Sequence, residues 1–176
     1  MILVLLLALA QSDNEFVQLN SVFSTDTVPF KRLYHSMDYN NENNTLVIFG
    51  GQRGLASQYN DVWIFNLSNS KYSLLYPTNE FSPGNFYLAP RSNPGCFVDP
   101  STNTLYIFGG LSEKGPQNDL WSFSLSGYQW KREKPSGRIP NSRYRFGYTK
   151  FYWEGSLKFA VFGGSLAAGE SNSLFL

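Results

Sequence analysis

"TLYIFGG" at residues 104–110 ends a short apolar run on two glycines, and "TLVIFGG" at 45–51 and "KFAVFGG" at 158–164 do the same. These runs are too short for helices and rich in strand-forming residues, so each predicts a β-strand buried on both faces. A glycine pair can leave such a strand with positive φ and let neighbouring backbones come close. The three stretches therefore predict the same exit from a strand at three places in the chain.

The residues around the glycine pairs repeat as well. An arginine stands 18 positions before the first glycine in two copies and 20 in the third, and an aromatic residue stands 11 positions after each of two aspartates. The repeated residues are Arg32, Gly50, Gly51, Asp61, Trp63 and Tyr72, then Arg91, Gly109, Gly110, Asp119, Trp121 and Trp130, then Arg143, Gly163 and Gly164. Intervals of 59 and 54 residues between the glycine pairs indicate an array of small modules, each with about four short strands.

The glycine pairs, the "NDVW" and "NDLW" stretches and the aromatic residue after them resemble the kelch-repeat (galactose oxidase-like) β-propeller family. The resemblance covers nearly everything from Phe16 onward. It implies an all-β fold with about three four-stranded blades of an incomplete ring, and large indoles that fill the space between sheets. In the third repeat "NSLF" at 172–175 replaces the aspartate and tryptophan, and that blade has no fourth strand of its own. "EFVQLN" at 15–20 reads as a fourth strand without its first three, and such a strand often completes the last blade of a kelch ring.

The predicted divisions are a signal peptide at 1–10, an N-terminal segment with a closing strand at 11–31, and kelch repeats at 32–90, 91–142 and 143–176, the last incomplete. Kelch rings usually have five to seven blades, so three blades leave three interpretations. In the first and favoured interpretation, the chain is the N-terminal piece of a longer propeller. In the second, two chains self-associate into a six-bladed ring. The third interpretation is an open arc, which would expose strand edges and apolar surface.

Residues 2–10 are all apolar, which fits the core of a secretory signal and is too short to span a membrane. Ala8 and Ala10 fit the small-residue cleavage pattern, although no Lys or Arg precedes the apolar run, and a buried strand is the alternative. The expected location is therefore the secretory pathway or the extracellular space, with no membrane span in this chain. Asn43 and Asn66 begin acceptor sequons, so the chain is expected to be a glycoprotein.

Charge and residue usage exclude several functions. The net charge is +1 and no Lys/Arg cluster is present, which gives no support for nucleic-acid binding. With one histidine and one cysteine, no internal disulfide and no typical zinc or copper site can form, and no cofactor or metal is expected. Cys96 is expected to be a buried, inert thiol, and His35 is expected to pack in the first strand of its repeat. The recurring aspartates are expected to accept backbone N–H bonds at a turn, and the recurring arginines to brace the loops between blades.

Function is then expected in variable loops on a rigid scaffold. The leading hypothesis is a non-catalytic scaffold that binds protein or glycan ligands through loops on one propeller face. The alternatives are part of a carbohydrate-active propeller enzyme whose catalytic residues are largely absent here, and a degenerate fragment without activity. In kelch proteins these loops correspond to residues 52–58, 111–117 and 165–171, and to 82–90 and 136–142. The candidate ligand contacts are Arg53, Arg145, Tyr34, Asn93 and Gln52; the two arginines are placed to hold an acidic ligand, unless they are merely solvated.

Overall fold

The computed structural model describes residues 28–54, 57–76 and 88–176, and these residues form strands, turns and loops without any helix. The prediction of an all-β fold is confirmed. Residues 1–10 and 15–20, for which a signal peptide and a closing strand were expected, lie outside the described residues. Within the described part of the chain, no helix is long and apolar enough to cross a membrane.

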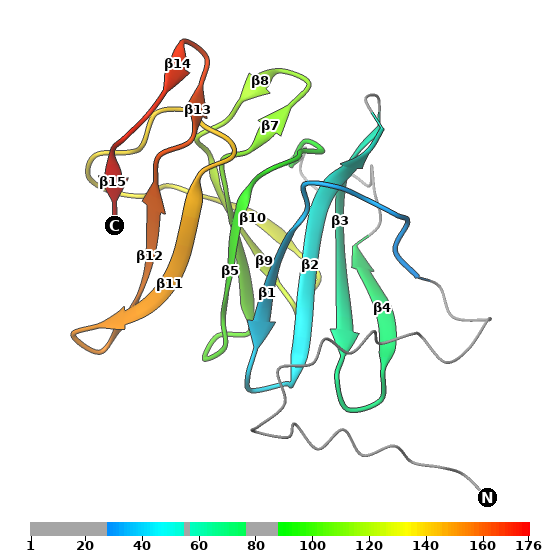
Figure 1. Ribbon diagram of the computed structural model, residues 1–176. Helices are drawn as coiled ribbons and strands as arrows, with labels where there is room; N and C mark the ends of the chain where they lie inside the picture. The colour runs from blue at the N-terminus through cyan, green and yellow to red at the C-terminus, as the bar shows by residue number, and fades with distance from the viewer. Residues whose placement is uncertain (1–27, 55–56, 77–87) are drawn as a thin grey trace, which may run out of the picture.

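Three antiparallel sheets follow one another along the chain and stand side by side in space, and we call them blades 1, 2 and 3 (Figure 1). Blade 1 has the strand order β1-β2-β3-β4 and is built from β1 (Ser36–Asn40), β2 (Thr45–Arg53), β3 (Ser57–Asn66) and β4 (Lys71–Tyr76). Blade 2 has the order β5-β6-β9-β10 and is built from β5 (Gly95–Asp99), β6 (Thr104–Phe108), β9 (Leu120–Ser124) and β10 (Trp130–Glu133).

Blade 3 has three strands in the described residues, β11 (Gly147–Trp153), β12 (Ser156–Phe162) and β15 (Leu174–Phe175). Two short hairpins extend blades 2 and 3 beyond their glycine pairs. They are β7 (Leu111–Ser112) with β8 (Gly115–Pro116), and β13 (Ser165–Leu166) with β14 (Gly169–Glu170). In blade 1 the corresponding extension is continuous with β2 and β3, because Gln52 and Arg53 pair with Gln58 and Ser57 beyond a bulge. All three extensions rise at the upper end of the sheets in Figure 1.

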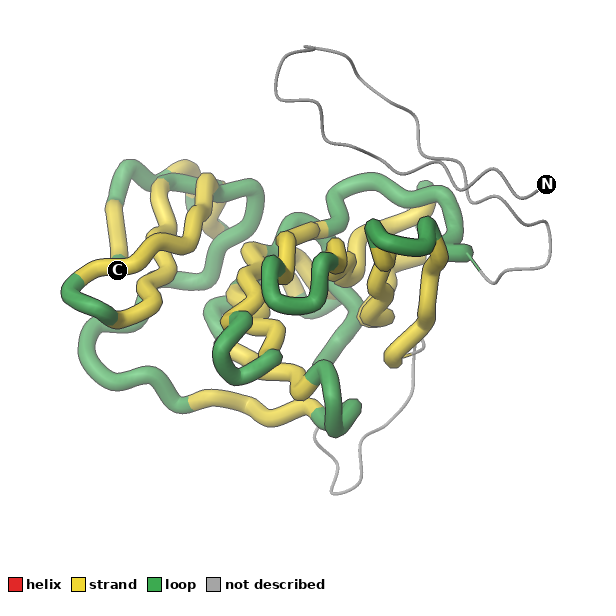
Figure 2. The backbone as a smooth tube through the Cα atoms, turned by 90° about the horizontal axis from the view of Figure 1, so that it is seen from below, coloured by secondary structure: helices red, strands yellow, loops and turns green. Residues whose placement is uncertain are grey.

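The first strand of each blade lies on the inside of the arrangement. β5 contacts both β1 and β11, and the view from below shows the three sheets fanning outward (Figure 2). The described segments that lead directly into β1, β5 and β11 lie at the same end of the molecule as the three extensions (Figure 1). This arrangement brings residues from three separate repeats together at one inner rim.

Most of the core lies between blades 1 and 2. Blade 1 contributes Val47, Phe49, Val62 and Tyr76, and blade 2 contributes Cys96, Val98, Leu105, Ile107, Trp121, Phe123 and Trp130. The Trp130 ring is at the centre of this cluster, with its centroid 4.8 Å from Phe123, 5.6 Å from Phe49 and 6.0 Å from Tyr76. Burial of such a ring stabilises a fold by about 2–3 kcal/mol.

A smaller core joins blades 2 and 3. Phe108 of blade 2 packs with Phe146 and Val161, with Leu120, Tyr148 and Phe159 partly buried around them. Phe97 of β5 also stacks on Phe159, with 4.7 Å between the ring centroids. Each blade is thus held to the blade before it mainly by aromatic side chains.

Candidate ligand-binding face

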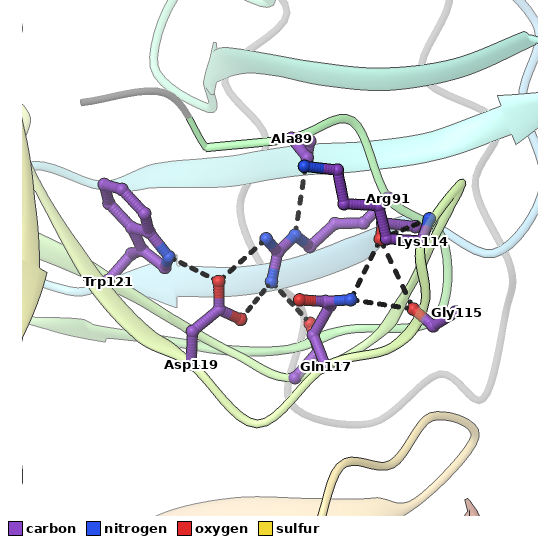
Figure 3. A network of polar contacts seen from close by, with 9 residues as sticks. Ala89, Arg91, Lys114, Gly115, Gln117, Asp119 and Trp121 are labelled. Carbon is purple, nitrogen blue, oxygen red and sulfur yellow. Dashed lines mark hydrogen bonds and ion pairs between the residues drawn. The ribbon is translucent and has the colours of Figure 1, made fainter. Parts of the chain in front are cut away.

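The rim of the molecule rests on a buried arginine at the start of each repeat. Arg91 donates from Nη1 to Asp119 Oδ1 at 2.6 Å and to the Gly109 carbonyl at 2.9 Å, and from Nη2 to Asp119 Oδ2 at 3.1 Å (Figure 3). Trp121 Nε1 donates to the same carboxylate at 2.7 Å. Burial raises the pKa of Asp119, but the hydrogen bonds and charge of Arg91 outweigh it, so the pKa lies below its ordinary value of 3.8. The carboxylate is therefore charged at neutral pH and pairs with a charged guanidinium.

Blade 1 repeats this network with Arg32 and Asp61. Two charge-assisted bonds of 2.6 and 2.8 Å join their side chains, Arg32 also donates to the Gly50 carbonyl, and Trp63 donates to Asp61. From the sequence, these aspartates are expected to accept backbone N–H bonds at a turn. The structure shows arginine and tryptophan side chains as their partners, and the similar spacing of Arg and Asp in two repeats, 29 and 28 residues, was the signal for this pairing.

The backbone of the same arginines joins neighbouring blades. Arg91 N donates to the Tyr59 carbonyl, and the Arg91 carbonyl accepts from Gly51 N, each at 3.0 Å. Arg143 makes the matching pair with Gln117 and Gly110, at 2.8 and 2.9 Å. The glycine pair permits this approach because a Cβ on Gly50 would lie 2.9 Å from the Arg91 carbonyl oxygen. Glycine is therefore required at this position for contact between blades as well as for its φ of +63°.

Blade 3 departs from the network. Arg143 is 1% exposed and donates to the Gly163 carbonyl at 2.8 Å, but Ser173 stands where the other repeats have aspartate. Among the described residues Arg143 has no carboxylate partner, and its guanidinium carbon lies 5.1 Å from the centroid of the Phe175 ring instead. Desolvation lowers the pKa of Arg143. An aromatic face thus replaces the carboxylate in this repeat.

Two positions after each arginine, the three repeats place Tyr34, Asn93 and Arg145. All three have positive φ, at 58°, 52° and 56°, which is uncommon for residues other than glycine. Asn93 N donates to the Tyr34 carbonyl at 2.8 Å, which joins the lead-in segments of blades 1 and 2. Because the same conformation recurs in each repeat, it belongs to the scaffold, and the side chains at this position are what differs between blades.

Arg145 reaches from blade 3 toward blade 1. Its guanidinium carbon lies 5.7 Å from the centroid of the Tyr34 ring and 5.6 Å from that of Tyr144, within the range of cation–π contacts. Arg145 is exposed, and it forms no ion pair with any residue in the described part of the chain. The structure therefore brings three of the five candidate ligand contacts, Tyr34, Asn93 and Arg145, to one cluster that we call the rim cluster, in which Tyr34 and Arg145 are exposed and Asn93 is half-buried.

The other two candidates lie on the extension of β2. Arg53 is exposed at the end of that strand, and Gln52 pairs through its backbone with Leu33, while its side chain donates to the Gly54 carbonyl at 2.9 Å. Nearby, Gln58 Nε2 donates to the Leu111 carbonyl at 3.0 Å, and its buried Oε1 has no hydrogen-bond partner among the described residues. Sequence reasoning did not single out Gln58, and no motif marked it.

The residues weighed for chemistry are scattered. Cys96 is buried at the interface of blades 1 and 2, where burial raises the pKa of its thiol to about 12. His35 lies just before β1 rather than packed within it, and although the residue is exposed, partial desolvation of its ring and then the Arg32 charge lower its pKa. No three metal-ligating side chains gather in the described ranges. Asn43 is exposed in a turn and Asn66 is half-buried.

Comparison with known proteins matches nearly the whole chain to one family. The model described as the KLHDC2/KLHL20/DRC7 Kelch-repeats domain matches residues 13–176. Multiple epidermal growth factor-like domains protein 8 of Mus musculus is 28% identical over 121 residues, which are 66% of this chain and 4% of that protein. Tip elongation aberrant protein 1 of Schizosaccharomyces pombe is 30% identical over 125 residues, which are 69% of this chain and 10% of that protein. Acyl-CoA-binding domain-containing protein 4 of Arabidopsis thaliana is 31% identical over 132 residues, 75% of this chain and 18% of that protein. The chain thus corresponds to a small part of the length of each of these relatives.

Proposed function

Because the chain belongs to the kelch-repeat family, we propose that it is a non-catalytic protein-binding scaffold whose ligand docks on the rim cluster. The observation that carries this proposal is the state of Arg145, whose exposed guanidinium lies over the rings of Tyr34 and Tyr144, 5.7 and 5.6 Å from their centroids, with no ion pair in the described residues. Stacking on rings fixes the plane of a guanidinium while leaving its N–H donors available. The ligand chemistry that fits is a carboxylate presented by an acidic peptide segment.

The neighbouring polar groups suit the same ligand. Asn93 offers a side-chain amide, and Arg53 and Gln52 stand on the β2 extension at the same end of the blades (Figure 1). A second arginine would add affinity for a ligand with two or more acidic residues. A glycan ligand, the other class expected from the sequence, would stack on Tyr34 and Tyr144 without needing the guanidinium, so removal of the charge separates the two classes.

The test is binding of a fluorescent library of Asp/Glu-containing peptides, measured by polarisation with wild type, Arg145→Ala and Arg53→Ala. We expect peptide affinity to fall about 10-fold or more for Arg145→Ala, the size of a lost charge-assisted hydrogen bond. Arg132→Ala removes an exposed arginine of the outer strand β10, away from the ligand loops, and is the matched control. Equal affinity for the Asp/Glu library and its Asn/Gln counterpart, or unchanged affinity in both variants, would reject the acidic ligand.

We also propose that the protein enters the secretory pathway, on the strength of the apolar residues 2–10. Asn43 suits glycosylation because it is exposed in the turn between β1 and β2, although its side chain also donates to Asn103 at 3.0 Å. Treatment of the protein from a eukaryotic host with a glycosidase for N-linked glycans should lower its mass, and Asn43→Gln combined with Asn66→Gln should remove that change. A mass that the enzyme leaves unchanged would count against glycosylation and secretory passage.

A further inference from the structure

Blade 3 repeats the backbone of the other blades just before its third strand, but with a different side chain. Gly163 N donates to the Ser173 carbonyl at 3.1 Å. In blade 2, Gly109 N donates to the Asp119 carbonyl at the same distance of 3.1 Å. The residues that follow pair with the preceding strand in the same register in both blades. Ser173 is therefore the structural equivalent of Asp119, and its hydroxyl stands where blades 1 and 2 carry a carboxylate.

Arg143 keeps the main-chain contacts of the repeat arginines without their carboxylate. It donates from Nε to the Asn141 carbonyl at 3.0 Å and from Nη1 to the Gly163 carbonyl at 2.8 Å. Arg91 makes the two equivalent bonds and adds two to Asp119, one from Nη1 and one from Nη2 (Figure 3). Nη2 of Arg143 has no acceptor among the described residues. Because a guanidinium carries five N–H donors, those that bind the carboxylate in blade 2 are available in blade 3.

The positive charge of Arg143 also has no balancing acid in the described part of the chain. Its guanidinium is buried, and a buried charge without a counter-charge is costly. The Phe175 ring attracts the guanidinium, but a ring face supplies neither a negative charge nor the two acceptor oxygens of a carboxylate. The guanidinium carbon of Arg138 lies 6.0 Å from the centroid of the same ring. Two guanidinium groups thus share one aromatic ring, and neither forms an ion pair with a described residue.

We infer that blade 3 binds a small monovalent anion of the size of chloride between the Arg143 guanidinium and the Ser173 hydroxyl. The ion takes the position that the Asp119 carboxylate has in blade 2 and accepts charge-assisted bonds from the guanidinium. Ser171 and Ser173 add a donor, because their hydroxyl oxygens lie 2.6 Å apart and one shared proton leaves the other O–H free. Arg143 is 1% exposed, so a free ion reaches it where an acidic side chain of another protein does not. The site is thus separate from the acidic ligand proposed for the rim cluster.

The test compares urea unfolding of wild type and Ser173→Asp in sodium chloride and in sodium gluconate at equal ionic strength. Gluconate is too large for the site. An ion that binds only the folded protein lowers the unfolding equilibrium constant in proportion to its concentration over its Kd. With a Kd of about 10 mM, about 100 mM chloride should lower that constant for wild type about tenfold relative to gluconate. Ser173→Asp supplies the carboxylate from the chain itself, so its unfolding constant should be the same in both salts.

Asn172→Asp is the matched control, because it adds the same charge at the exposed neighbouring residue and should keep the wild-type response to chloride. Chlorine NMR of the chloride ion reports binding directly and needs no variant. The chloride line should broaden with folded wild type and narrow again when urea unfolds the protein, while Ser173→Asp should leave the line narrow. Equal stability of wild type in the two salts, a chloride response that Ser173→Asp retains or Asn172→Asp loses, or a line that folded wild type does not broaden would each overturn the proposal.

Discussion

The charge of Arg91 explains why arginine and aspartate recur together. Arg91 is 1% exposed, so its guanidinium is stable only with a partner that supplies charge and hydrogen bonds. The recurrence of both residues in the sequence predicted a structural role, but the aspartate was expected to accept backbone N–H bonds, as an aspartate before a strand ordinarily does, and the arginine partner was not predicted. Their separation of 28 and 29 residues in two repeats was the signal that linked them.

Asp119→Asn should therefore cost more than its small change in shape suggests. The amide cannot balance the charge of Arg91, and removal of one member of a buried ion pair costs about 3 kcal/mol. The free energy of unfolding, measured in urea at pH 7, reports this loss. Lys131→Gln breaks the exposed pair with Glu133 and is the control, which should leave the urea midpoint nearly unchanged.

The same variant has a predictable dependence on pH. The Asp119 carboxylate has a pKa below its ordinary 3.8 in the folded protein, so its contribution is complete above that pH and is lost as the pH falls through the lowered pKa. The gap in stability between wild type and Asp119→Asn is thus expected to be largest near neutrality and to narrow below pH about 4. If the difference in free energy of unfolding between wild type and Asp119→Asn stayed constant down to pH about 2, the ion pair would not be its cause.

The strands themselves were the most predictable elements. β2, β6 and β12 contain the apolar runs before the glycine pairs and lie in the middle of their blades. β2 and β6 are largely buried, whereas Val161 is the one buried residue of β12, so the prediction of burial on both faces is wrong for that strand. The hairpins β7–β8 and β13–β14 were not predicted. Each strand of these hairpins has only two residues, too few to show apolar alternation or a strand preference in the sequence.

The glycine pair is the element that joins one blade to the next, and Gly109→Ala tests it. A Cβ there would lie 2.9 Å from the Arg143 carbonyl oxygen and 3.2 Å from that of Gln117. Gly54 has the same φ of +60° and open space around its Cβ position, so Gly54→Ala carries the backbone strain without the clash. Gly109→Ala should thus be less stable than Gly54→Ala by about 2 kcal/mol, as judged by urea unfolding. Equal losses in the two variants would mean that conformation alone explains the glycine.

The rim cluster was only partly readable from sequence. The equivalence of Tyr34, Asn93 and Arg145 followed from counting from the repeat arginines, but their meeting depends on how three blades fan around a common interior. The contact of Arg145 with the Tyr34 ring joins residues 111 positions apart, and no local pattern encodes such a contact. Periodicity predicts which positions are equivalent, and the geometry of the whole molecule decides which of them touch.

Lys150 makes a second set of contacts between blades that the sequence repeat did not predict. From β11 its ammonium donates to Asp38 Oδ2 at 2.6 Å and to the carbonyls of Tyr39 at 3.0 Å and Val98 at 3.1 Å. Asp38 also accepts from Val98 N at 2.7 Å. One side chain thus ties the inner strands of all three blades, at positions that no repeat motif distinguished.

Lys150→Met should loosen the attachment of blade 3 most of all. The larger core lies between blades 1 and 2, so blade 3 depends more on the smaller aromatic cluster and on this ammonium. We expect a loss of about 2 kcal/mol in the free energy of unfolding, since hydrogen bonds to a charged group contribute 1.5–3 kcal/mol. Lys158→Met, at an exposed position of β12, is the control for loss of a lysine.

Combining Lys150→Met with Asp38→Asn should lower the free energy of unfolding by less than the sum of the two single changes, because each change already breaks the same ion pair. Strict additivity, or faster amide exchange in β1 rather than in β11, would show that Lys150 does not hold blade 3 to the other two.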